Sequence, residues 1–303
     1  MTDRLVVRTT LFALGIVFVS FIATSVIMLI ASTVEKHEGS SRACIAPPAN
    51  FRLNQPAPSL FIYSFNVPGV LNEAPGIKES TSPYWFLDSG GRLIINNGIG
   101  TTIRGPLPAG DRWHDTYARS NPRDTDDGTH PQNIFRLVSI YEWENVSEEV
   151  WFRIAGDNFS ASPNRNQSNG LFLMSRYCDS DNLYYAGIRV DGTAVIKKKY
   201  AGIYYTVAQT PLFSGSYNAR ENPNLLPHES WLALKSVTET GVDGTVFVRL
   251  YMKASEESPW KLVASAADHG EWGGTPPILR DGQVGIRTDF MDVQFKNIRI
   301  EAL

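Results

Sequence analysis

Apolar and polar residues alternate with a period of two through most of the chain beyond residue 59. Val150, Phe152 and Ile154 are apolar with Arg153 between two of them, and residues 246–252 repeat the pattern. Residues at i and i+2 of a strand point to the same face of a sheet, so each series predicts a half-buried antiparallel strand. Turn dipeptides separate the series at short intervals, among them Asn97-Gly98, Asp191-Gly192, Asp243-Gly244 and Asp281-Gly282. We therefore predict an all-β chain with many short strands.

The N-terminal part carries a different apolar pattern. No Asp, Glu, Lys or Arg lies between Arg8 and Glu35. At 1.5 Å per residue, a helix of about twenty residues crosses a hydrocarbon core roughly 30 Å thick. We predict a short cytoplasmic tail at 1–8 and one transmembrane anchor at 9–32. Removal of the segment by cleavage near Ala31-Ser32 is the alternative.

The orientation of this anchor is not decided by charge. Two arginines precede it, and one lysine and one arginine come after it within the window that the positive-inside rule counts. Because a lone signal-anchor ordinarily exports the chain on its C-terminal side, we expect a single-pass protein of the cell membrane with its C-terminal domain extracytoplasmic. Residues 33–58 are rich in Pro, Ser and Ala and predict a semi-extended stalk. The length of residues 59–303 suits one large sandwich or two smaller domains, and because no change of composition divides them, we predict one domain.

Charge and cysteine content exclude some classes of protein. The formal net charge is -3 and the pI is near 6.0, and no basic run is present, so we predict no nucleic-acid partner. The two cysteines, Cys44 and Cys178, do not make a disulfide framework. They form either one bridge or two unpaired thiols, and the sequence leaves both open.

A three-strand meander is predicted over 183–209. Asp191-Gly192 is a strong type I′ hairpin signal, and Ala201-Gly202 is a plausible second turn. Two-residue loops at both turns fix the cross-strand register. One face then carries Tyr185, Lys198 and Tyr205 in a row, and the other carries Tyr184, Lys199 and Tyr204.

The face that bears Tyr184 also carries Ile188, Val190 and Val195, so we expect it to be the core side. The opposite face adds Arg189 and Gly187 to the Tyr-Lys-Tyr row, and a mid-strand glycine lets a ligand approach the backbone. Such a strip suits stacking on sugar rings and pairing with carboxylate or sulfate groups. The alternative is a solvated face in which lysine stems cover tyrosine rings.

The last strand has a change of parity. Val293 and Phe295 share one face of the alternation, whereas Ile298 and Ile300 share the other. A β-bulge near Asn297 would place all four in the core.

Several segments resemble a known superfamily. These segments are Tyr184–Lys199, Trp231–Lys235, Val246–Tyr251 and Gly282–Asn297. They are similar to the closing half of the concanavalin A-like lectin/glucanase jelly roll, a superfamily that includes laminin-G-like modules and family 16 glycoside hydrolases. Residues 91–97, 124–135 and 168–173 are similar to segments of uncharacterised, membrane-anchored bacterial proteins of this fold. The resemblance covers roughly 59–303 and implies an antiparallel jelly-roll β-sandwich, a concave carbohydrate-binding face and often a structural calcium.

Catalytic signatures are weak. Family 16 hydrolases carry Glu-x-Asp-x-x-Glu on one strand, because retaining hydrolysis needs two carboxylates about 5 to 5.5 Å apart. This chain has only Glu142 and Glu144, which would share a strand face, and a solvated strand end explains them equally. Polysaccharide lyases on similar sandwiches use Tyr or His as a base with Arg and amide groups, and His130, Tyr204 or Tyr205 and Arg189 supply those residue types.

Two places are candidates for calcium. The loop around Asp124 and Asp126 gathers the oxygen ligands that calcium prefers, although Asx turns alone explain such a sequence. The second candidate is Asp292 on the closing strand, where calcium-binding jelly rolls often supply a carboxylate.

The hypothesis from sequence is a membrane-anchored carbohydrate-binding module. Its contact residues would be Tyr185, Arg189, Lys198 and Tyr205, with Trp272 at the periphery because flanking glycines present its indole. A polysaccharide lyase or glycoside hydrolase acting at the same face is the alternative. A structural adhesion protein that binds other proteins is the second alternative.

Overall fold

The structure is a computed structural model that describes residues 56–303. The predicted tail 1–8, the anchor 9–32 and most of the stalk 33–58 lie outside the described residues. Cys44 lies there too, so its pairing with Cys178 is not tested. Within 56–303, no helix has both the length and the apolar character needed to cross a bilayer.

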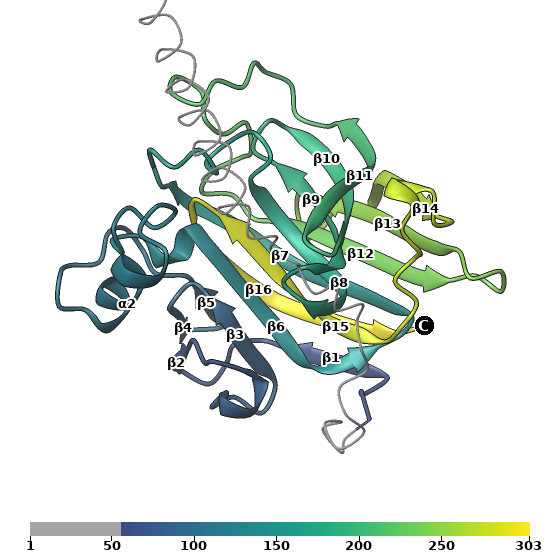
Figure 1. Cartoon of the computed structure of the whole chain (residues 1–303), viewed down its shortest axis with the longest axis horizontal. Coiled ribbons are helices and arrows are strands. Elements are labelled where there is room, and N and C mark those ends of the chain that lie inside the picture. Colours follow the sequence, from purple (N-terminus) through teal and green to yellow (C-terminus); the bar gives the residue numbers. More distant parts are fainter. Residues whose placement is uncertain (1–55) are drawn as a thin grey trace, which may run out of the picture. The chain divides into compact units, whose positions relative to one another are not determined.

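Two antiparallel sheets form a sandwich (Figure 1), which confirms the all-β prediction. The nine-stranded sheet contains β1 (Leu60–Tyr63), β2 (Gly69–Asn72), β4 (Arg92–Asn96), β5 (Ile99–Thr101), β7 (Val146–Asp157), β12 (Leu232–Thr240), β13 (Val246–Lys253), β14 (Lys261–Asp268) and β16 (Met291–Ala302). The seven-stranded sheet contains β3 (Trp85–Ser89), β6 (Ile134–Trp143), β8 (Gly170–Asp179), β9 (Asn182–Arg189), β10 (Thr193–Tyr200), β11 (Ile203–Pro211) and β15 (Gly282–Asp289).

The chain crosses between the sheets five times from β6 onward. The order in the larger sheet is β14-β13-β12-β7-β16-β5-β4-β2, with β1 also paired to β16, and in the smaller sheet β11-β10-β9-β8-β15-β6-β3. The last two strands, β15 and β16, therefore lie inside different sheets. Strands that alternate between two antiparallel sheets in this way are a feature of jelly-roll sandwiches.

Aromatic rings from both sheets meet in the main core. Phe135 of β6 stacks on Phe295 of β16 with ring centroids 5.4 Å apart, and Phe152 of β7 meets Phe295 edge-on at 5.7 Å. All three side chains are fully buried. Such ring pairs contribute about 0.5–1.5 kcal/mol each beyond the area that they bury, so they help to hold the sheets together.

The bulge predicted in the last strand is confirmed. The register of β16 against β7 shifts between Lys296 and Arg299, and Asn297 has a φ of 52°. Asparagine tolerates this left-handed conformation better than most residues. As a result Ile298 and Ile300 are buried in the same core as Phe295.

The helix α2 (Arg112–Ser120) covers one end of the sandwich. Asp111 caps its N-terminus by accepting a hydrogen bond from the Trp113 backbone N at 2.8 Å. Trp113 and Tyr117, four residues apart, lie on one helix face and pack with Ile103 and Leu107 in a small separate core. The loop after α2 leads through the 3₁₀ turn η3 (Pro131–Asn133) into β6.

Candidate functional site

The predicted register of the meander is wrong by one residue. Tyr185 of β9 pairs with Lys197 of β10, and Tyr184 pairs with Lys198. The cause is the hairpin loop, because Val190–Gly192 leaves three residues between the strands instead of two. A shift of one residue moves every side chain of a strand to the other face of the sheet. The second loop, Ala201-Gly202, has the predicted length.

The shift removes Lys198 and Tyr205 from the predicted strip. Lys198 is fully buried and forms an ion pair with Asp268, with 2.8 Å between Nζ and Oδ2. Tyr205 pairs with Lys198 and packs against Gly273, where an added Cβ would lie 2.2 Å from the tyrosine ring. Trp272, in the 3₁₀ turn η4 (Trp272–Gly274), has its Nε1 buried without a hydrogen-bond partner among residues 56–303. Lys198 and Tyr205 therefore lie on the other face of the sheet from Tyr185.

A pocket of about 520 Å³ opens on the outer face of the seven-stranded sheet. Strands β8 to β11 and β15 form its floor, and the loop between β7 and β8 forms one wall. Its lining residues are Asp124, Ile134, Asn164, Asn166, Ser168, Asn169, Phe172, Tyr185, Lys197, Tyr204, Thr206, Arg287, Asp289 and Phe290. Of the predicted ligand-binding residues, only Tyr185 lines it.

Aromatic rings form the apolar part of the pocket. Tyr185 and Tyr204 are stacked, with centroids 6.1 Å apart and an interplanar angle of 27°. Phe172 meets Tyr185 edge-on at 6.0 Å. Tyr185 is only 2% exposed, whereas Tyr204, which we had predicted on the core side, is 48% exposed. Tyr204 therefore offers an accessible ring edge and hydroxyl at the pocket.

Arg287 of β15 holds both tyrosines in place. Its Nη1 donates hydrogen bonds to the hydroxyls of Tyr185 at 3.0 Å and Tyr204 at 3.1 Å, and its Nε donates to Asp289 at 2.8 Å. Burial raises the pKa of Tyr185. Burial acts in the same direction on Tyr204, but the positive charges of Arg287 and Lys199 outweigh it, so the pKa of Tyr204 is lowered.

Lys197 supplies a cation to the pocket, and the nearby negative charge of Asp289 favours its charged form. Its Nζ lies 5.9 Å from the ring centroids of both Phe172 and Tyr204, and it makes no hydrogen bond or ion pair within residues 56–303. Burial, followed by the positive charge of Arg189, lowers the pKa of Lys197. An ammonium in this position can bind an anionic group without first losing a partner.

Arg189 and Gly187 have structural roles near the pocket. Arg189 is 9% exposed, forms an ion pair with Asp191, and donates from Nε to the Gln167 carbonyl at 3.2 Å. A Cβ at Gly187 would lie 2.1 Å from the Leu171 carbonyl oxygen. Neighbouring protein atoms alone therefore explain the glycine, and the approach of a ligand to its backbone stays a prediction.

The weak catalytic candidates do not line the pocket. Glu142 and Glu144 are exposed at the far end of β6 from Ile134, and Glu142 lies 4.0 Å from Arg280. A strand of this length spans roughly 30 Å, so these carboxylates are remote from the tyrosines. His130 is bound to Asp126, with 3.1 Å between Nδ1 and Oδ2.

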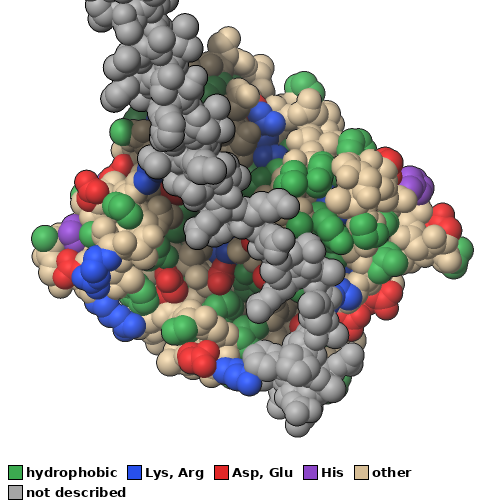
Figure 2. Space-filling model, viewed as in Figure 1, with side chains coloured by type: hydrophobic (Ala, Val, Ile, Leu, Met, Phe, Trp, Pro, Cys, Tyr) green, Lys and Arg blue, Asp and Glu red, His purple; other side chains and the backbone are tan. Residues whose placement is uncertain are grey.

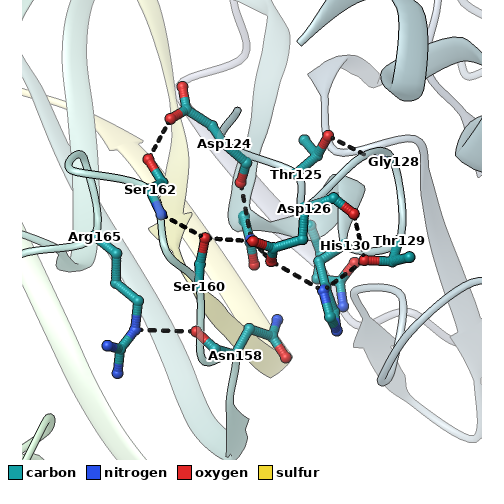
Figure 3. Close-up of polar contacts among 12 residues, drawn as sticks. Asp124, Thr125, Asp126, Gly128, Thr129, His130, Asn158, Ser160, Ser162 and Arg165 are labelled. Carbon is teal, nitrogen blue, oxygen red and sulfur yellow. Dashed lines mark hydrogen bonds and ion pairs between the residues drawn. The ribbon is translucent and has the colours of Figure 1, made fainter. Parts of the chain in front are cut away.

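The Asp124 and Asp126 carboxylates belong to a hydrogen-bond network between two loops (Figure 3). Asp124 Oδ1 accepts from the Ser162 hydroxyl at 2.6 Å, and Asp126 Oδ1 accepts from the Ser160 hydroxyl at 2.5 Å. This network links the loop after α2 to the loop that forms a wall of the pocket.

The Asp292 carboxylate is also held by hydrogen bonds from neighbouring groups. Its Oδ2 accepts from the Gly105 backbone N at 2.6 Å, and its Oδ1 accepts from the amides of Gln132 and Asn158, each at 3.0 Å. In residues 56–303 no group of three or more His, Cys, Asp or Glu side chains could hold a metal. N–H donors occupy the carboxylate oxygens that would face an ion, so the Asp292 donor set does not fit calcium.

Comparisons with known proteins give structural similarities only. No protein-family model and no curated protein sequence matches the chain. Among solved structures, the carbohydrate binding module CBM66 from Bacillus subtilis is similar over 57% of this chain and 85% of its own, with 15% identity and a TM-score of 0.40. The Ca²⁺- and Man-bound exoplasmic/lumenal domain of VIP36 is similar over 77% and 89%, with 9% identity and a TM-score of 0.39. The PL-14 alginate lyase from Aplysia kurodai is similar over 78% and 100%, with 8% identity and a TM-score of 0.36.

Proposed function

We propose that this protein is a carbohydrate-binding protein that takes a sugar carrying a carboxylate or sulfate group into the pocket formed by Tyr185, Tyr204, Lys197 and Arg287. Carbohydrate sites combine aromatic surface, which packs on the apolar face of a sugar ring, with polar groups that bind its hydroxyls. The tyrosines and Phe172 supply the first element. Asn164, Asn166 and Asn169 at the rim supply the second.

The observation that supports this proposal most strongly is the unpaired ammonium of Lys197. Cations on protein surfaces near acidic side chains are usually paired, and Arg287 in the same pocket is bound to Asp289. Lys197 instead lies beside aromatic rings and makes no direct hydrogen bond or ion pair within residues 56–303, although the charge of Asp289 acts on it from a distance. The pocket is therefore complementary to an anion that also presents an apolar ring face.

Affinity electrophoresis tests the proposal. The full-length protein, kept in mild detergent, is run through gels that contain neutral, uronate-containing or sulfated polysaccharides. We expect retardation in the uronate or sulfate gels and little in the neutral ones. Equal mobility in every gel would contradict a glycan site at this pocket.

A polysaccharide lyase is the second candidate function, and Tyr204 favours it. β-Elimination of a uronate needs a base near the sugar C5 and a cation near the carboxylate. Tyr204 combines an accessible hydroxyl, a lowered pKa and a bond to Arg287. Tyr204→Phe keeps the ring and removes the hydroxyl. A lyase would lose formation of unsaturated products in this variant and keep binding, whereas a binding protein would form no such products even in its native form.

We also propose that residues 9–32 anchor the protein in the cell membrane with the pocket outside. The uncharged apolar run between Arg8 and Glu35 supports this proposal. Alkaline extraction should leave the protein in the membrane fraction, and protease added to intact cells should degrade residues 59–303. Release by alkali, or protection from protease, would contradict the anchor or its orientation.

A further inference from the structure

The most deeply buried ion pair of the described chain lies outside the pocket, between the two sheets. Lys198 of β10 is 0% exposed and Asp268, the last residue of β14, is 1% exposed. β10 belongs to the seven-stranded sheet and β14 to the nine-stranded sheet. The pair therefore connects the two layers where the segment 269–281 leaves β14 for β15.

The Lys198 amine and both Asp268 carboxylate oxygens have defined neighbours. Lys198 Nζ lies 2.8 Å from Asp268 Oδ2 and donates to the Thr275 carbonyl at 2.9 Å. The Tyr184 hydroxyl donates to the same Oδ2 at 2.5 Å. Asp268 Oδ1 accepts a hydrogen bond from the Gly270 backbone N at 2.9 Å. The amine, the leaving oxygen and the remaining oxygen are thus separately positioned.

We propose that Lys198 and Asp268 condense to an intramolecular isopeptide bond, an amide between Nζ and Cγ that joins the two sheets covalently. The inference rests on this juxtaposition alone and is independent of the proposed carbohydrate function.

The reaction needs no oxidant and no co-reactant. The Lys198 ammonium transfers one proton to Asp268 Oδ2, and the resulting amine attacks Cγ to form the C–N bond. The Gly270 N–H stabilises negative charge on Oδ1 in the tetrahedral intermediate. The C–Oδ2 bond then breaks, and Oδ2 leaves as water with a second proton from nitrogen.

Tyr184 serves as the acid and proton relay at the leaving oxygen. Burial raises the pKa of its phenol, so the hydroxyl stays protonated and able to donate. The Ile278 backbone N donates to the Tyr184 oxygen at 3.1 Å and fixes its position. Tyr184 therefore positions protons for the condensation without becoming part of the product.

Burial favours the condensed form. Charges removed from water carry a large desolvation cost, and the amide replaces both charges with a neutral group. The product keeps the hydrogen bonds of the pair, because the amide N–H still faces the Thr275 carbonyl and Oδ1 still faces the Gly270 N–H. Both side chains are closed to solvent, so bulk water has no direct access to hydrolyse the amide.

Mass spectrometry of the purified full-length protein tests the inference. The intact mass should be lower than the sequence mass by one water molecule. Trypsin should release a branched peptide that joins Lys198 to residues 262–280. Recovery of peptide 262–280 unbranched, together with an intact mass equal to the sequence mass, would overturn the proposal.

Two variants distinguish formation of the isopeptide bond from other reactions in which the protein loses water. Lys198→Met should show its full sequence mass, and its peptide 262–280 should be unbranched. Tyr184→Phe keeps the ring in the core but should slow condensation, so that freshly synthesised protein contains both forms. Complete and immediate condensation in Tyr184→Phe would contradict the role given to Tyr184, and a water loss that persists in Lys198→Met would contradict the bond itself.

Discussion

Lys197 is the residue on which the proposed preference for anionic sugars depends. Lys197→Ala should weaken binding of a uronate or sulfated oligosaccharide by roughly ten- to a hundred-fold, because a hydrogen bond to a charged group contributes about 1.5–3 kcal/mol. Lys261→Ala, which removes the same charge from an exposed position on β14, is the matched control. Titration calorimetry of both variants measures the effect. Equal losses of affinity in Lys197→Ala and Lys261→Ala would show that binding depends on the net charge of the protein and not on the position of Lys197.

The same residue predicts a pH dependence of binding. Burial lowers the pKa of Lys197 from its ordinary value of 10.5, so the ammonium loses its proton at a lower pH than an exposed lysine does. Affinity for an anionic sugar should fall as pH rises through this lowered pKa, at a lower pH than for a site that relies on an exposed lysine. Affinity for a neutral sugar should not follow this curve.

Glu148 of β7 is a buried carboxyl without a partner among the described residues. Neither side-chain oxygen has a hydrogen-bond partner there, and burial raises its pKa well above 4.5. The folded state therefore holds this proton more tightly than the unfolded chain, and its contribution to stability is lost as pH rises through the folded-state pKa. Glu148→Leu should raise the free energy of unfolding at neutral pH by roughly 1–3 kcal/mol, with a smaller gain below pH 4.5.

Urea unfolding at both pH values measures this change. Glu149→Gln on the same strand is the control, since Glu149 lies on the opposite face and pairs with Lys235 at 3.4 Å. A loss of stability in Glu148→Leu at neutral pH would mean that the carboxylate has a role that its surroundings do not reveal.

The sequence pattern was sufficient to predict the positions of some pocket residues but not of others. Arg287 and Asp289 stand two apart on a predicted strand, so their ion pair on one face could have been found from the alternation. Lys197 could not be distinguished in the same way. It belongs to a run of three lysines, and a shift of one residue decides which of them faces the core.

At the scale of elements, the sequence predicts strands and bulges better than loop lengths. The change of parity around Asn297 identified the bulge, because apolar residues before and after it had to reach one core. The dipeptide Asp191-Gly192 is compatible with a loop of two or three residues. Val190 is buried and becomes the third residue of the loop. No local sequence pattern predicts this longer loop. This extra loop residue removed Lys198 and Tyr205 from the predicted binding strip.

The packing of β8 against β9 gives a prediction at this scale. Gly187→Ala should destabilise the protein by about 1–3 kcal/mol, because its Cβ would collide with the Leu171 carbonyl and with Phe172. Gly156→Ala on β7 is the control, since nothing lies within 4 Å of a Cβ there. Thermal unfolding should show a lower melting temperature for Gly187→Ala than for Gly156→Ala. Equal melting temperatures would contradict the close packing of β8 against β9.

At the scale of the whole molecule, period-two alternation predicted an all-β sandwich or barrel, and the resemblance of several segments to a known superfamily favoured the sandwich. Acidic and basic side chains are interspersed on the described part of the face seen in Figure 2. The pocket itself could not be predicted. It combines β8 to β11, β15 and the loop 158–169, which come together only when the sheet order is known.

Calcium is expected to leave the stability of the whole domain unchanged. Hydrogen-bond donors already occupy the Asp292 carboxylate and much of the Asp124 and Asp126 carboxylates. Melting temperatures measured with calcium and with a chelator should therefore agree. A higher melting temperature with calcium would contradict this expectation and indicate a calcium site in the domain.

The central claim is that an acidic sugar binds in the pocket on the outer face of the seven-stranded sheet. Thr206 lines this pocket, and Thr210, exposed on the same strand, does not. We would titrate the native protein, Thr206→Trp and Thr210→Trp with an oligosaccharide from the polymer that retards the native protein in gels. The account predicts that Thr206→Trp, whose indole fills the pocket, loses binding while Thr210→Trp binds like the native protein. Undiminished binding by Thr206→Trp would place the sugar elsewhere and contradict the account.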